Sequence, residues 1–416
     1  MSDPKTQPTP APEVTPMPRL GPRPLALHVA QAMGSGLGAM AALPAVCAGT
    51  YPWPAELRDE AARLAAALDR TEPMALLAAT AAAGGQRLET MLAGIRAYQA
   101  HPYRRALPAP IERWHEGTTR LLDYGGDGLA VLFVPSLVNR YYVLDLMAER
   151  SLLRWLAGQR VRPLVVDWGA PGEIERGFDL DDYITGRLGR LLDHVLTAVE
   201  RPPALVGYCL GGNLALGLAS RRQQDLAGLG LLATPWDFHA GHGAQARLLE
   251  LMEAGLDGLL GGFGELPVDV LQALFAWLDP NLAARKFRRF HRLAPDGRAA
   301  RRFVALEDWL NDGVPLAPKV ARACLVGWYG RNQPIRGEWR LAGQPVRPET
   351  LRLPRLLAIP DGDRIVPPAS AEALAAAMPE ARVLRPRAGH IGMVVGGGAE
   401  AGLWRPLLDW LLSLAK

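Results

Sequence analysis

The spacing of apolar residues divides the chain into three parts. Residues 1–24 are rich in Pro and Thr and contain no apolar run, so we expect a disordered tail. Residues 25–112 show a helical spacing of Ala and Leu, clearest in residues 56–70 and 72–97, and no strand-like run. In residues 113–416, short apolar runs alternate with helix-length stretches, which indicates a second, larger domain.

The alternation predicts an α/β domain built on a parallel sheet. Its first element is expected to be a β-hairpin, in which residues 118–124 and 129–135 flank a Gly-Gly-Asp-Gly turn. The strands expected after it are residues 162–168, 204–208, 228–234, 355–359 and 382–385. The expected helices are residues 142–159, 181–199, 213–221, 370–378 and 402–414. Alternation of this kind produces βαβ units, whose strands are parallel.

Two stretches differ from their surroundings. Residues 239–345 contain helical patches and aromatic residues but no convincing strand pair, so we expect an insertion between two strands of the sheet. Residues 25–48 are apolar, but His28, Gln31 and several glycines occur among them, and Pro44 interrupts the run. We therefore expect a helix that docks on the core, on a partner or on another apolar surface, and no transmembrane segment.

Composition narrows the classes of function. The formal net charge of +4 is small for 416 residues and does not indicate a general nucleic-acid-binding protein. Cys47, Cys209 and Cys324 are too few for a disulfide framework, and the N-terminus lacks the apolar stretch of a secretory signal. Both features favour a cytoplasmic protein. No Cys/His cluster has metal-ligand spacing, so we expect neither a metal nor a bound cofactor.

Cys209 lies in a motif that is typical of a catalytic nucleophile. The sequence Gly207-Tyr208-Cys209-Leu210-Gly211 follows an apolar run and opens an expected helix. In such a nucleophile elbow the strand turns sharply into the helix, and a Cβ two positions before or after the nucleophile would clash. The nucleophile then lies at a helix N-terminus, where the helix dipole favours a thiolate. We predict that Cys209 is the nucleophile and that Cys47 and Cys324 are inert.

The candidate acid and base follow Cys209 in the order nucleophile, acid, base that this kind of active site requires. Asp361 and Asp363 both lie in the loop expected after strand 355–359, and the pattern alone leaves the choice between them open. His390 lies after the next strand and is the only histidine in the last hundred residues, so we predict that it is the base.

The other histidines are expected to have structural or surface roles. His239 and His242 lie at the start of the insertion, where they could line a pocket, but a structural role is favoured for each. The remaining ones that we considered are expected to be solvent-facing or helical, and these are His101, His115, His194 and His291.

Acyl transfer also needs two backbone N–H donors for the oxyanion that forms during the reaction. One is expected from Leu210, the residue after the nucleophile. The other is expected from the loop after strand 129–135, where Leu137 has the appropriate position.

Beyond these features the chain resembles the polyhydroxyalkanoate synthases of the α/β-hydrolase superfamily, over about residues 123–414. The segments that carry the resemblance are residues 134–146, 167–171, 180–184, 207–212, 234–239, 363–367 and 389–393. Several of them are similar to the shorter, two-subunit class. The resemblance to the acid motif selects Asp363 over Asp361, and it implies that the insertion at residues 239–345 is a cap over the active site. The chain departs from the family pattern at Ser136, where proline is usual, and at Arg364, where histidine is usual.

The resemblance implies a role for each candidate residue. Cys209 would carry the acyl group or growing chain as a thioester, and His390 would deprotonate Cys209. Asp363 would orient His390 or help to activate the 3-hydroxyl group of the incoming unit. The substrate would be an (R)-3-hydroxyacyl-CoA, and the products a polyhydroxyalkanoate and free coenzyme A. A thiol suits this transfer, because attack on a CoA thioester gives a thioester of similar energy.

The resemblance also implies partners, which are the growing polyester chain or a granule surface in the cytoplasm, and either a second copy or a second synthase subunit. The apolar stretch at residues 25–48 could bind such a surface. A thioesterase or polyester depolymerase with the same triad is the alternative, and a non-catalytic granule protein is a further one. The basic run at residues 285–289, with Arg292, is either a solvated helix face or a binding site for the coenzyme A phosphates.

Overall fold

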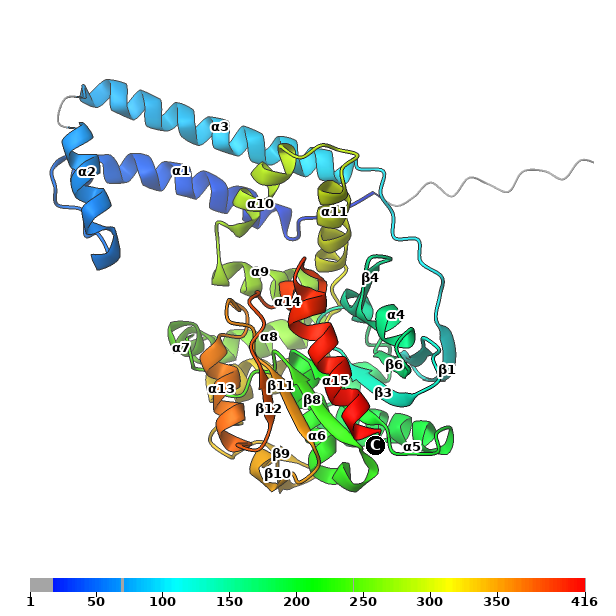
Figure 1. The fold of residues 1–416 in the computed structure, drawn as a ribbon. Helices are drawn as coiled ribbons and strands as arrows, with labels where there is room; N and C mark the ends of the chain where they lie inside the picture. The colour runs from blue at the N-terminus through cyan, green and yellow to red at the C-terminus, as the bar shows by residue number, and fades with distance from the viewer. Residues whose placement is uncertain (1–17, 69–70, 242, 416) are drawn as a thin grey trace, which may run out of the picture.

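The structure is a computed structural model, and it describes residues 18–68, 71–241 and 243–415. An eight-stranded sheet forms the centre of the larger domain, in the order β1-β2-β6-β3-β7-β8-β11-β12 (Figure 1). Its strands are β1 (Ile111–Glu116), β2 (Thr119–Asp123), β3 (Leu129–Val134), β6 (Val161–Asp167), β7 (Ala204–Tyr208), β8 (Gly228–Leu232), β11 (Arg355–Ala358) and β12 (Arg382–Leu384). β2 is antiparallel to both of its neighbours, and the strands from β6 to β12 are parallel. The expected α/β fold with a parallel sheet is confirmed.

The hairpin expected between residues 118–124 and 129–135 is wrong. β2 forms a hairpin with β1, and β6 lies between β2 and β3 in the sheet. β1 is an edge strand with mostly exposed or half-buried side chains, so its sequence has no apolar run. β3 pairs with a strand that is distant in sequence, and local spacing does not reveal such a pairing.

The helix expected over residues 142–159 is wrong in its first half. The segment contains β4 (Asp145–Met147), β5 (Arg150–Ser151) and α4 (Leu152–Ala157). Asp145 is fully buried and accepts hydrogen bonds from Arg105 (2.6 Å), Arg154 (2.8 Å) and the Tyr124 hydroxyl (2.9 Å). Because a buried carboxylate requires such partners, this polar network holds the chain extended where spacing alone suggested a helix.

Helices cover both faces of the sheet. One face packs against α5 (Gly189–Thr197), α6 (Leu210–Arg222) and α13 (Pro368–Ala377), and the other against α4, α14 (Gly392–Val395) and α15 (Arg405–Leu414). Adjacent residues of β7 point to opposite faces, so that Leu205 belongs to the first apolar core and Val206 to the second. Burial on both faces explains why the central strands are apolar throughout.

The interval between β8 and β11 is mainly helical. It contains α7 (Gly243–Leu251), α8 (Glu253–Phe263), α9 (Val268–Leu278), α10 (Leu282–His291), α11 (Arg298–Asn311), α12 (Pro318–Arg322) and the π-helical stretch Ala323–Gly330. A small hairpin of β9 (Arg340–Leu341) and β10 (Gln344–Pro345) follows, although no strand pair was expected there. Each of these strands has two residues, too few to show an alternating pattern.

The N-terminal helices form a long arm beside this helical layer (Figure 1). They are α1 (Leu25–Cys47), α2 (Arg58–Leu68) and α3 (Pro73–Gln99). The C-terminal half of α3 is anchored, because Met91, Ile95 and Tyr98 pack with Phe287 and Phe290 of α10. Within the described part of the chain, α1 is long and apolar enough to cross a membrane, and none of its most apolar window is buried.

Residues 18–24, which fall within the expected disordered tail, lie against the larger domain in this structure. Arg19 forms an ion pair with Asp308 at 2.6 Å, and Arg23 forms one with Asp269 at 2.8 Å. The backbone N–H of Arg23 also donates to Asn311 at 2.8 Å. This segment therefore connects α1 to α9 and α11. The rest of the expected tail is outside the described residues.

Candidate active site

Cys209 occupies a sharp turn between β7 and α6. Its backbone angles are φ 57° and ψ −130°, a region that residues with a side chain rarely adopt. Such strain costs about 1–3 kcal/mol and persists only where surrounding contacts enforce it. Two backbone hydrogen bonds do so here, from Cys209 N–H to Leu232 (2.8 Å) and from Gly212 N–H to the Cys209 carbonyl (2.9 Å).

The glycines around Cys209 are required by close backbone approach. A Cβ on Gly207 would lie 2.4 Å from the Gly212 Cα atom, and a Cβ on Gly211 would lie 2.1 Å from the Val134 carbonyl oxygen. Atoms at these distances would overlap, so only glycine fits at either position. This is the geometry that the nucleophile-elbow motif predicts.

Asp363 and His390 meet beside the elbow. The Asp363 carboxylate accepts a hydrogen bond from His390 Nδ1 at 2.6 Å, and both side chains are buried. The second carboxylate oxygen accepts from the N–H groups of Ile365 and Val366, both at 2.9 Å. Asp361, the other candidate acid, is exposed in the preceding turn. The structure therefore brings together Asp363 and not Asp361 with His390.

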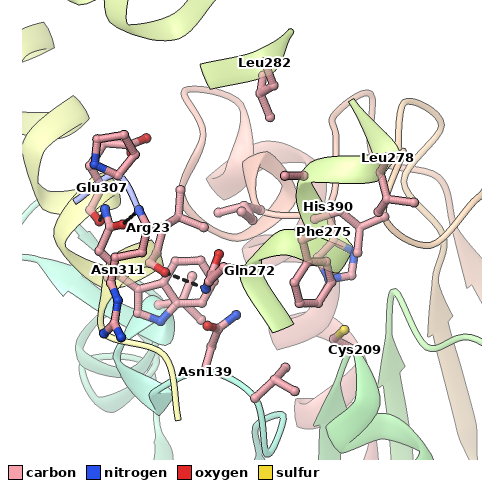
Figure 2. Close-up of a pocket in the computed structure, with 18 of the residues that line it drawn as sticks. Arg23, Asn139, Cys209, Gln272, Phe275, Leu278, Leu282, Glu307, Asn311 and His390 are labelled. Atoms are coloured by element: carbon pink, nitrogen blue, oxygen red, sulfur yellow. Dashed lines mark hydrogen bonds between the residues drawn. The ribbon is translucent and has the colours of Figure 1, made fainter. Parts of the chain in front are cut away.

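Tyr208 fixes the position of His390 from the other side. Its hydroxyl donates to the His390 carbonyl at 3.3 Å, and the centroids of the two rings are 5.2 Å apart. Because Nδ1 bonds Asp363, the remaining ring nitrogen, Nε2, is the atom available to Cys209. Figure 2 shows Cys209 below the His390 ring, at one end of the cavity.

The charge balance at His390 favours its protonated form. Burial lowers the pKa of His390, but the negative charge of Cys209 and the hydrogen bond to Asp363 outweigh burial and raise the pKa to about 10. The protonated form of His390 is thus stabilised by the site. In that state His390 holds the proton that a leaving group would need.

Replacing Cys209 with serine is expected to lower the pKa of His390, because the hydroxyl carries no charge at neutral pH and burial then opposes protonation. NMR titration of the His390 ring signals in both proteins measures this change.

The raised pKa of His390 also makes the stability of the fold depend on pH. The folded-state pKa lies above the unfolded value of about 6.5, so protonation of His390 stabilises the fold fully below about pH 6.5, and the effect is lost as the pH rises through about 10. Identical NMR titration curves of His390 in the wild-type and Cys209→Ser proteins would contradict the charge coupling between Cys209 and His390.

Leu210 follows Cys209 on the elbow, and Leu137 lies on the loop after β3. These are the positions predicted for the two oxyanion donors. The side chains of Leu210 and Leu137 are buried in the same apolar core. The loop is fixed by Trp168, whose indole N–H donates to the Pro135 carbonyl at 3.0 Å, and by Val314, whose N–H donates to Val138 at 3.0 Å. That both backbone N–H groups bind an oxyanion remains a prediction.

A cavity of about 280 Å³ opens above Cys209 and His390. Figure 2 shows these two residues at one end and Arg23, Glu307 and Asn311 at the other. The helical interval contributes the largest group of lining residues, which includes Phe275 of α9, Leu282 of α10 and Trp309 of α11. One wall is made by Pro22, Arg23 and His28. A mainly apolar cavity with few polar groups is typical of a small-molecule site.

Sequence reasoning missed the polar groups of this cavity. Asn139 lines it with a side-chain oxygen that has no hydrogen-bond partner among the described residues, and Gln272 donates its amide to Leu310 at 2.9 Å. Glu307 is buried and bonds Lys286 at 2.8 Å. Asn139 is the last residue of the predicted oxyanion loop, residues 134–139, a signal that was available. The others depend on helix packing and leave no local signal.

The other histidines and cysteines that the sequence analysis considered lie in the following positions of the structure. His101 is buried, contrary to the expected exposed or helical position, and its ring bonds the Pro295 carbonyl at 2.9 Å. His239 bonds the carbonyls of Tyr329 (3.1 Å) and Gly330 (2.9 Å), consistent with a structural role, and His242 is outside the described residues. Cys324 is buried, and burial raises its pKa to about 12, whereas Cys47 is exposed at the end of α1. Among the described residues, no cluster of His, Cys, Asp or Glu could hold a metal ion.

This arrangement can perform nucleophilic acyl transfer. A thiol on a strained elbow, a histidine within its reach and a carboxylate that orients the histidine are the parts that such chemistry needs. Water and another hydroxyl group are both chemically competent acceptors in a site of this kind.

Comparisons with known proteins agree with this description. The family model for the alpha/beta hydrolase fold matches residues 130–396. The poly(3-hydroxyalkanoate) polymerase subunit PhaC of Synechocystis sp. is 30% identical over 292 residues, which cover 68% of this chain and 77% of that protein. The protein of the same name from Haloferax mediterranei is 28% identical, with 73% of this chain and 63% of that protein covered.

Two further proteins are similar at lower sequence identity. The chain spans 62% of the length of the PhaC subunit of Haloarcula marismortui, to which it is 27% identical. Among solved structures, the monoacylglycerol lipase of Paleococcus ferrophilus is similar, with a TM-score of 0.47 and 16% identity over 71% of this chain and 99% of that chain.

Proposed function

Because the chain belongs to the poly(3-hydroxyalkanoate) polymerase family within the α/β-hydrolase fold, we propose that it polymerises (R)-3-hydroxyacyl units from their coenzyme A thioesters. The observation that carries the proposal is a cysteine on the elbow, with His390 and Asp363 bonded beside it. A cysteine thioester keeps the transfer potential of the CoA thioester, which a serine ester would lose.

The first step forms the acyl-enzyme. The Cys209 sulfur attacks the thioester carbonyl carbon, and the N–H groups of Leu210 and Leu137 stabilise the oxyanion. The C–S bond to coenzyme A then breaks, and His390 gives its proton to the departing thiolate. A raised pKa for His390 means that this proton is available at neutral pH.

The second step forms the ester bond of the polymer. The 3-hydroxyl oxygen of one unit attacks the thioester carbonyl of another, and the Cys209 sulfur leaves as a thiolate. His390 accepts the hydroxyl proton, and Asp363 holds the ring in the orientation that this transfer requires. If water replaces the hydroxyl group, the same step releases a free acid.

Residues 24–55 are proposed to bind an apolar surface in the cytoplasm, either a polyester granule or a second subunit. They contain no Asp, Glu, Lys or Arg, and the exposed side chains include Met33 and Leu37. An apolar helix with no buried residue gains free energy when a partner or polymer surface covers it.

Incubation of the purified protein with (R)-3-hydroxybutyryl-CoA tests the proposed reaction. The expected result is release of coenzyme A, followed with a thiol reagent, together with an insoluble polyester. Release of coenzyme A with only 3-hydroxybutyrate as product would replace the polymerase by a thioesterase. A lack of release, even with a supplied partner subunit and with longer acyl chains, would overturn both reactions.

A further inference from the structure

A second hollow lies outside the catalytic cavity, between the arm and α10. It has a volume of about 620 Å³ and is lined by residues of α1 and α3, by Asn281 and by the outer face of α10. We call it the arm groove. Its volume lies within the range of about 300–1,000 Å³ that is usual for small-molecule sites.

The floor of the arm groove is made of small residues. Ala32 and Gly36 of α1 and Ala79 and Ala83 of α3 line it. At Gly84, an added Cβ would lie only 3.7 Å from the Gly36 Cα atom, so the two backbones approach closely there. Small side chains on both helices leave the space above the crossing open.

All charged side chains that line the arm groove, among the described residues, are arginines. They are Arg87 of α3 and Arg285 and Arg288 of α10, and no Asp or Glu lines the groove. Arg285 bonds Asp279 at 2.5 Å, whereas Arg87 and Arg288 have no acidic partner in the described part of the chain. Ser35 and Thr80 add hydroxyl groups. The groove therefore holds uncompensated positive charge.

The basic run of α10 is divided between two sites. Lys286 points to the catalytic cavity, where Glu307 neutralises it. Arg285 and Arg288 point to the arm groove, where a second helix adds Arg87. One helix thus separates the catalytic cavity from a basic groove, an arrangement that a sequence run of like charges does not reveal.

We propose that the arm groove binds the phosphate groups of a ligand of nucleotide size. Guanidinium groups match phosphate with paired hydrogen bonds, and Arg288 is half-buried at the groove while Arg87 and Arg285 are exposed. The groove has no aromatic lining residue among those described, so the phosphates and not a stacked base would be held there. The phosphates belong either to the coenzyme A part of the substrate, a source that rests on the proposed function, or to a free nucleotide.

Calorimetric titration of the Cys209→Ala protein with coenzyme A, ADP and pantetheine tests the groove without turnover. Coenzyme A is expected to bind and pantetheine, which has no phosphate, is not. Arg87→Gln and Arg288→Gln are each expected to weaken coenzyme A binding about tenfold, since each removes a charge-assisted hydrogen bond. Ala79→Trp, which fills the groove without changing charge, should also weaken binding.

The matched control is Arg63→Gln, which removes the same charge from an exposed position on α2 outside the groove. It should leave the Kd unchanged, whereas raised salt should weaken binding in the wild-type groove. Binding of ADP that is as tight as that of coenzyme A, with the same loss in both groove variants, would identify a free nucleotide as the source. Absence of binding by either phosphate compound, or equal affinity in all four substituted proteins, would overturn the proposal whether or not the protein polymerises.

Discussion

Replacing Cys209 with alanine is expected to reduce coenzyme A release from the acyl-CoA substrate by about 10,000-fold or more, to the background rate. Loss of a nucleophile that acts together with its base removes nearly all of the acceleration that the two provide. The side chain is half-buried at the elbow, so alanine removes the sulfur and leaves the backbone turn in place. The measurement is the initial rate of free-thiol formation.

Cys47→Ala is the control for this substitution, because Cys47 is an exposed cysteine at the far end of α1. It should keep the wild-type rate, and thermal unfolding should show that both variants are folded. A Cys209→Ala protein that retains a rate within tenfold of wild type would rule out the acyl-enzyme and require a direct reaction on the substrate.

Gly211→Ala is expected to lower the free energy of unfolding by about 3 kcal/mol and to remove most of the activity. The new Cβ would lie 2.1 Å from the Val134 carbonyl oxygen and 2.5 Å from the Pro135 carbonyl carbon, which are backbone atoms of the predicted oxyanion loop. The loop and the elbow must move apart to accept it, at the cost of overpacking and of misplaced donors. Chemical denaturation and the rate of coenzyme A release measure the two effects.

Gly85→Ala provides a comparison with the opposite sign. Gly85 lies within α3, and apart from the neighbouring backbone of that helix no atom of the described residues is within 4 Å of an added Cβ. Alanine favours a helix over glycine by about 1 kcal/mol, so this variant should be slightly more stable and fully active. If Gly211→Ala behaves like Gly85→Ala, the elbow does not have the close approach described above.

The positions of the three candidate catalytic residues could be predicted because their signals are local. Cys209 lies between glycines that its own turn requires, and Asp363 and His390 each follow a short apolar strand. The choice between Asp361 and Asp363 was not local, since burial and the bond to His390 decide it. At the level of sequence, the choice of Asp363 required the resemblance to the polyhydroxyalkanoate synthases.

Features that depend on distant partners could not be predicted. β3 pairs with β6 and not with the nearer β2, because a crossover connection places β6 between them. Asp145 interrupts an expected helix through bonds to Arg105 and Tyr124, more than 20 residues away. The same is true of the cavity wall at Pro22, Arg23 and His28, because no pattern in the sequence around them identifies their partners.

The docking of Arg19 and Arg23 on α11 and α9 has a consequence for folding during synthesis. Asp308 and Asp269 are synthesised 289 and 246 residues after their partners Arg19 and Arg23. At about 5–20 residues per second, the N-terminal segment waits roughly 15–60 s for its docking surface. The wall at Pro22, Arg23 and His28 therefore cannot be completed before α11 has emerged, and the apolar helix α1 has no contact with the larger domain until α9 and α10 have been made.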